Sequence, residues 1–97
     1  MQPPVSDLPG AQLVARGLRD LDRGVESIES LLVSIGAPRL RDLGWPVENP
    51  FPSPEHRLYE RLRAAHGDAA HTRYNALIRR LVSFERAAAA VGAESRA

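Results

Sequence analysis

Apolar residues recur at helical spacing along the first third of the chain. Seven of them follow one another at intervals of 4, 3, 4, 3, 4 and 3 residues: Val14, Leu18, Leu21, Val25, Ile28, Leu32 and Ile35. This heptad spacing places its members along one side of a helix and is typical of helices that pack lengthwise against another helix. The pattern predicts one continuous helix over residues 9–35, ended by Gly36 and Pro38.

The second half of the chain predicts two further helices. Ser53 followed by Pro54 has the composition of a helix start, because serine caps free N–H groups and proline suits the first turn. A helix is therefore expected over residues 54–66. A glycine–aspartate pair separates it from a third helix over 69–91, in which the apolar positions again follow a heptad. The alternative is one helix over 54–91, which requires one stutter in the repeat.

In the segment 36–53, between the first and second predicted helices, the apolar residues follow neither a helical nor a strand spacing. Its four prolines and two glycines exclude a long helix or a central strand, yet it carries Trp45 and Phe51. Two interpretations stay open. The segment is a loop packed on the helices with Trp45 as its anchor, or it is a partner-binding surface, since tryptophan is frequent at contact sites between proteins.

These elements predict an all-α fold, a small bundle of two long helices and one shorter helix. A single domain is expected over 9–92, with a disordered arm at 1–8 and a frayed tail at 93–97. A helix over 9–35 would be about 40 Å long, whereas a compact chain of this size has a radius of gyration of only ~13 Å. The short helix over 54–66 cannot fully cover its apolar side, and the third helix covers only part of it.

We therefore expect a homodimer. Its interface would be the seven heptad residues of the first helix, because soluble monomers rarely expose so long an apolar stripe. Acidic residues beside that stripe would meet arginines of the third helix, Arg79 and Arg80, across the interface. Together with Trp45 and Phe51, these two arginines are the residues expected to contact a partner.

The amino-acid composition is that of a soluble globular domain and excludes several classes of protein. The 97 residues are 43% hydrophobic and carry a net charge of +1, as expected of a soluble globular domain and not of a polybasic binder of nucleic acid or membranes. With no cysteine, the chain has no disulfides, thiolate nucleophiles or cysteine-bound metals. No signal peptide, membrane span, cofactor motif or metal motif is recognisable. We expect a cytoplasmic protein without a cofactor or metal and without membrane association.

One pair of residues invites a catalytic interpretation. Arg61 and His66 have the spacing R-x4-H, which resembles the arginine–histidine pair of the HEPN superfamily, compact helical dimers that often act as ribonucleases. The resemblance implies that His66 would act as acid or base and that Arg61 would hold the phosphate. Leu62 follows the arginine, where that family usually has a polar residue.

Charge is distributed unevenly along the chain. Residues 1–50 hold five arginines and seven acids, whereas residues 51–97 hold eight arginines and five acids. An arginine face in the second half could bind nucleic acid or an acidic protein, or it could pair with acids of the first half. The function expected from the sequence is a non-enzymatic helical interaction module, acting as a homo-oligomer in the role of adaptor, regulator or accessory subunit. The alternative is a nucleic-acid-acting protein, either a HEPN-like ribonuclease or a binder that uses the arginine face.

Overall fold

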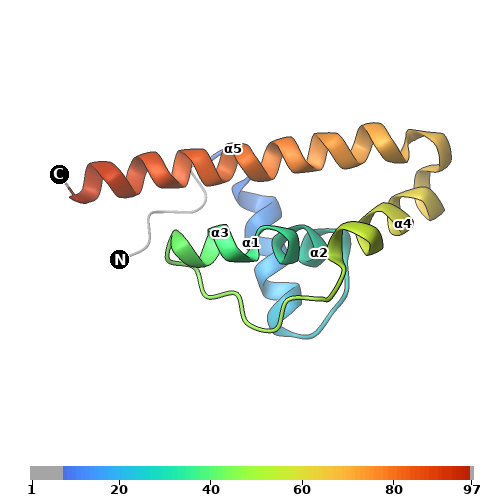
Figure 1. Ribbon diagram of the computed structural model, residues 1–97, viewed down its shortest axis with the longest axis horizontal. Helices are drawn as coiled ribbons and strands as arrows, with labels where there is room; N and C mark the ends of the chain where they lie inside the picture. The colour runs from blue at the N-terminus through green and yellow to red at the C-terminus, as the bar shows by residue number, and fades with distance from the viewer. Residues whose placement is uncertain (1–7, 97) are drawn as a thin grey trace.

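A computed structural model describes residues 8–96, with the side chains described as far as Gly92. This part of the chain contains helices and no strand, which confirms the all-α fold class. The helices are α1 (Ala11–Asp22), α2 (Ile28–Ile35), α3 (Ala37–Asp42), α4 (Pro54–His66) and α5 (Ala70–Arg96), with a 3-10 turn, η2 (Gly67–Ala69), before the last. In Figure 1, α5 runs along the whole length of the molecule and the shorter helices lie on one side of it. No helix within the described residues is long and apolar enough to cross a bilayer.

The predicted continuous helix over 9–35 is wrong. The chain leaves the helix after Asp22, turns through residues 23–27 and returns as α2, which packs against α1 more extensively than any other pair of elements does. Gly24 adopts a positive φ of 71°, a conformation that ends helices and that glycine reaches without strain. Ser27 then caps α2, since its Oγ accepts the N–H of Ser30 at 3.0 Å while the Ser30 Oγ accepts the N–H of Ser27 at 2.7 Å.

The turn changes the role of the heptad residues. Val14 and Leu32 are fully buried and Leu21 nearly so, while Leu18, Ile28 and Ile35 pack against the same core from its edge. Val25 lies in the turn and is exposed, at 48%. Six of the seven residues assigned to a dimer interface are thus covered within one chain, because α2 folds back and supplies the neighbour that a second chain was expected to supply.

Gly17 permits this close packing. A Cβ on Gly17 would collide with the carbonyl oxygen of Glu29 and would lie 2.7 Å from the Cγ1 of Val33. Gly17 and Gly24 stand seven residues apart beside the apolar heptad, a spacing that favours close approach of a neighbouring helix. The structure shows that approach at Gly17, with α2 of the same chain as the neighbour.

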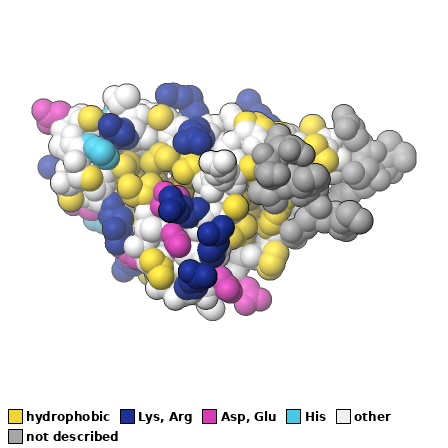
Figure 2. Space-filling model, turned by 180° about the vertical axis from the view of Figure 1, so that it is seen from behind, with side chains coloured by type: hydrophobic (Ala, Val, Ile, Leu, Met, Phe, Trp, Pro, Cys, Tyr) yellow, Lys and Arg dark blue, Asp and Glu magenta, His cyan; other side chains and the backbone are white. Residues whose placement is uncertain are grey.

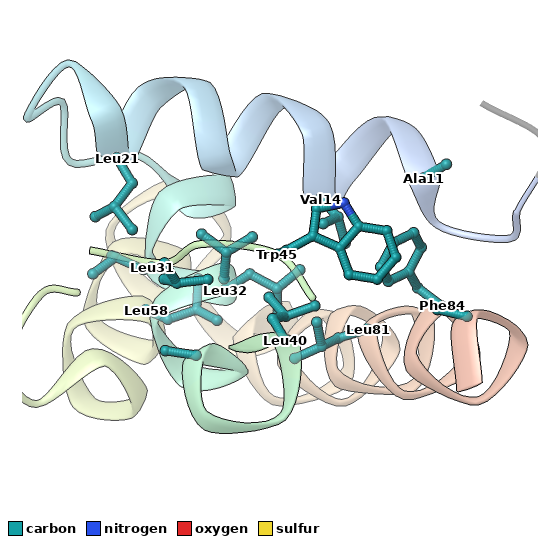
Figure 3. Close-up of a cluster of buried hydrophobic side chains, with 14 of the residues drawn as sticks. Ala11, Val14, Leu21, Leu31, Leu32, Leu40, Trp45, Leu58, Leu81 and Phe84 are labelled. Atoms are coloured by element: carbon teal, nitrogen blue, oxygen red, sulfur yellow. The ribbon is translucent and has the colours of Figure 1, made fainter. Parts of the chain in front are cut away.

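The segment 36–53 contains more structure than the sequence predicts. Its first part forms α3, because Pro38 stands in the first turn, where a missing N–H costs no hydrogen bond. The remainder, residues 43–53, is called the 43–53 loop below. Trp45 is only 4% exposed, and its ring centroid lies 5.3 Å from that of Phe84 on α5. Figure 3 shows the two rings side by side between α1 and α5.

The second half follows the broken version of the prediction. α4 spans Pro54–His66, and Gly67, with a φ of 56°, separates it from α5. The start of α4 is as expected but its capping is not. Ser53 adopts a left-handed conformation and makes no side-chain cap, and only its carbonyl accepts the N–H of Arg57 at 3.1 Å.

The last helix is longer than predicted, and most of the predicted N-terminal arm lies outside the described residues. The tail was expected to fray after Gly92, but α5 continues to Arg96, because a lone glycine costs a helix only about 1 kcal/mol. Of the expected arm, residues 1–7 lie outside the described residues, and Leu8 packs against the core.

Candidate functional site

An open hollow of about 450 Å³ lies between the C-terminal half of α1 and the 43–53 loop. Its volume falls within the range typical of ligand and side-chain pockets. Residues of two kinds line it. Leu18, Leu21, Trp45 and Pro46 contribute apolar surface, and Arg19, Asp22 and Glu48 contribute charge.

Two hydrogen bonds to residues of α3 hold the wall of the hollow. The backbone N–H of Trp45 donates to the carbonyl of Leu40 at 3.0 Å, and the side-chain Nε of Arg41 donates to the carbonyl of Val47 at 2.9 Å. Val47 itself is buried in the core. The loop therefore presents Pro46 and Glu48 from fixed positions, and a ligand would find the hollow already formed.

The expected partner residues fall in different places. Trp45 lies in the core and reaches the hollow only as part of its floor. Phe51 is half-buried against the core, and its N–H donates to the Ser34 Oγ at 3.0 Å, which ties the loop to α2. Arg79 and Arg80 are exposed on α5. The structure does not bring these four residues together.

The catalytic alternative places Arg61 and His66 on α4. The Nε of Arg61 lies 3.2 Å from Glu26 Oε2, and the Nη1 of Arg57 lies 2.6 Å from Glu26 Oε1. One carboxylate therefore pairs with two guanidinium groups, and a phosphate would have to compete with it for Arg61. His66 is exposed at the end of the same helix, and positions five apart point to different sides of a helix. The geometry does not assemble the pair into a site.

Two groups have shifted pKa values, and each marks a packing contact. Burial raises the pKa of Tyr74, helped by the charge of Glu55, where the Tyr74 ring meets the Tyr59 ring edge-on between α5 and α4. Burial likewise raises the pKa of Glu85, against the opposing effect of Arg39. Within the described residues, no group of three or more acidic or histidine side chains could hold a metal ion.

No pattern in the sequence groups Leu18, Arg19, Asp22, Pro46 and Glu48 into one site. Leu18 was assigned to the dimer interface, and the others carried no motif. Their proximity comes from contacts between α1 and a loop more than twenty residues away. Comparisons with protein-family models, curated proteins and solved structures find no match to this chain.

Proposed function

We propose that the protein is a non-enzymatic helical interaction module, an adaptor, regulator or accessory subunit that binds a protein partner in the hollow between α1 and the 43–53 loop. The observation that carries this proposal is the make-up of the hollow, with Leu18, Leu21 and Trp45 inside a charged rim. Protein interfaces have this arrangement, in which an apolar centre supplies affinity and a polar edge supplies orientation.

The rim indicates the chemistry of the partner. Asp22 and Glu48 outnumber Arg19, and none of the three takes part in an ion pair within the described residues. An arginine or lysine side chain would satisfy both features, since its aliphatic stem can lie on the apolar floor while its charged end meets the carboxylates. The module therefore favours a partner segment with a basic residue beside an apolar one.

A displayed library of random peptides tests this preference. The wild-type protein should enrich peptides that carry Arg or Lys next to an apolar residue. Binding of a purified hit should shift the amide and indole resonances of Trp45 in an NMR titration, because that ring forms the floor. The double variant Asp22→Arg/Glu48→Arg should lose at least ten-fold in affinity for the same hit.

The matched control reverses two exposed acids elsewhere, Asp42→Arg and Glu60→Arg, and changes the net charge equally. It should keep the affinity within two-fold. Equal losses in both double variants would show a general charge effect. Shifts that map away from Trp45 would refute the hollow as the binding site.

The proposal includes the homo-oligomer expected from the heptad residues. The apolar stripe that was expected to drive dimerisation is, however, not exposed in the folded chain. Six of the seven residues assigned to the interface are covered inside one chain, so an uncovered stripe cannot drive dimerisation. Support for self-association has to come from measurement. Sedimentation equilibrium between 10 and 200 µM distinguishes a concentration-dependent dimer from a monomer, and a constant monomer mass would remove the homo-oligomer from the proposal.

A further inference from the structure

The outward side of α5 carries four arginines. Arg73 and Arg80 stand seven residues apart, as do Arg79 and Arg86, so each pair forms a row along the helix. All four are exposed, and none takes part in an ion pair within the described residues. From Arg73 to Arg86 the rows extend about 20 Å along the axis, at 1.5 Å per residue.

A second group of arginines continues this surface on α1. The first turn of α1 lies against α5, where a Cβ on Gly10 would come within 2.8 Å of the Arg80 carbonyl oxygen, and Gln12 and Arg80 line one small hollow. Arg16 follows Gln12 by one helical turn, Arg23 caps the end of α1, and both arginines are exposed. Figure 2 shows dark-blue arginine side chains at the top of the molecule, over α5, and further ones below it, where magenta acidic side chains lie among them.

These six residues, Arg16, Arg23, Arg73, Arg79, Arg80 and Arg86, are called the arginine face. On α5 the acid beside these arginines is Glu85, which is half-buried, whereas Asp20 and Asp22 lie beside the arginines of α1. Glu26 pairs with arginines of α4, and Asp20, beside Arg16 and Arg23, accepts a hydrogen bond from the Ser27 Oγ at 2.7 Å instead of pairing with either arginine. The positive charge of the face is therefore concentrated on α5, in a chain whose net charge is only +1.

We propose that the arginine face binds the phosphate backbone of double-stranded nucleic acid without reading its sequence. Guanidinium groups bind phosphates through paired hydrogen bonds, and hydroxyl groups commonly add further phosphate contacts. Thr72 and Ser83 provide exposed hydroxyls between the arginines. The attraction to phosphate supplies nearly all of the affinity in binding of this kind.

The residues around the arginines favour a duplex over a protein partner or a single strand. They are small or hydroxyl-bearing, including Ala76, Ala87 and Ala90, whereas protein interfaces depend on large apolar or aromatic side chains at their centre. Single-stranded nucleic acid is bound by stacking its bases on exposed aromatic rings. In the described structure Trp45 and Phe84 are buried against each other, and the two tyrosines pack edge to face.

Fluorescence anisotropy with labelled 24-base-pair DNA and RNA duplexes tests the proposal. Binding of at least one duplex in the micromolar range is expected at 50 mM salt, and four phosphate contacts imply a salt slope of about −3.6. Affinity should then fall on the order of 100-fold between 50 and 200 mM salt. The variant Arg79→Gln/Arg86→Gln should bind at least ten-fold more weakly and show a slope smaller by about 2.

The control variant Arg39→Gln/Arg63→Gln removes the same charge from exposed positions outside the face and should bind within two-fold of wild type. Circular dichroism should be unchanged in both, because none of these four side chains forms an ion pair in the described structure. Equal losses in both variants, or no duplex binding at 50 mM salt, would overturn the proposal. Tighter binding of single-stranded DNA or of polyglutamate than of either duplex would overturn it as well.

Discussion

Gly17 on α1 faces the carbonyl oxygen of Glu29 on α2 with no room for a side chain between them. The contact brings two backbones together, and a backbone cannot turn aside as a flexible side chain can. The contact between Gly17 and Glu29 fixes how closely α1 and α2 approach each other. It thereby also fixes the position of Leu18 and Leu21, which lie on α1 and line the hollow. The first prediction tests this contact.

Replacing Gly17 with alanine should destabilise the protein by about 1–3 kcal/mol, the usual cost of overpacking, despite the better helix propensity of alanine. Urea denaturation followed by circular dichroism measures the change. Gly92→Ala is the control, because a Cβ there meets nothing within 4 Å. A Gly17→Ala variant as stable as wild type would mean that the two helices separate easily.

Trp45 should behave as a core residue. As the one tryptophan of the chain, it should emit blue-shifted fluorescence that acrylamide quenches poorly, since its ring is packed against Phe84. Trp45→Ala should cost about 3–5 kcal/mol, as emptied aromatic sites in cores do. Red-shifted and freely quenched emission would show instead that the 43–53 loop detaches in solution.

Two members of the original heptad should respond very differently to a charge. Val25→Asp should change stability by no more than about 0.5 kcal/mol, because the side chain is exposed in the turn. Leu32→Asp should unfold the protein, because it buries an unpaired carboxylate in the core. Thermal melts of the two variants measure the contrast. Similar losses of stability in the two variants would support the continuous helix over 9–35 instead of the turn at residues 23–27.

Glu85 should make stability depend on pH. Burial raises the pKa of this carboxyl in the folded state. Above that pKa the carboxylate is charged in both states, and burying the charge lowers the stability of the folded protein relative to the unfolded chain. The destabilisation is absent below the ordinary pKa of 4.5 and grows as pH rises through the folded value. Glu85→Gln should therefore be more stable than wild type at pH 7 but not at pH 4, as paired urea titrations would show. An equal difference at both pH values would exclude ionisation as the cause.

The ribonuclease alternative predicts RNA cleavage that His66→Ala abolishes. With Arg61 bound to Glu26, we expect wild type and His66→Ala to be equally inert towards a generic labelled RNA. Glu26→Gln, which releases both arginines, should remain inert and cost less than about 1 kcal/mol, because the ion pairs are exposed. Cleavage by wild type that is lost in His66→Ala would establish the catalytic alternative.

The sequence by itself determined the helical class and the place where α4 begins. It also indicated the end of α4 and the packing of the Trp45 loop, each beside one open alternative. Each of these follows from local rules. Apolar spacing selects helix over strand, Pro54 fits a first turn, Gly67 interrupts a helix, and a large aromatic ring in a proline-rich segment gains most free energy by burial.

Tertiary structure alone decided which side of each helix meets which neighbour. The heptad runs through the turn in phase, so its spacing could not distinguish one long helix from two that fold together, although Gly24 and the pair Ser27 and Ser30 carried the local signal of a break. The bond from Glu26 to Arg57 spans 31 residues, and the hollow joins α1 to a distant loop. Contacts at such separations depend on how complete surfaces fit, a property that no short stretch of sequence encodes.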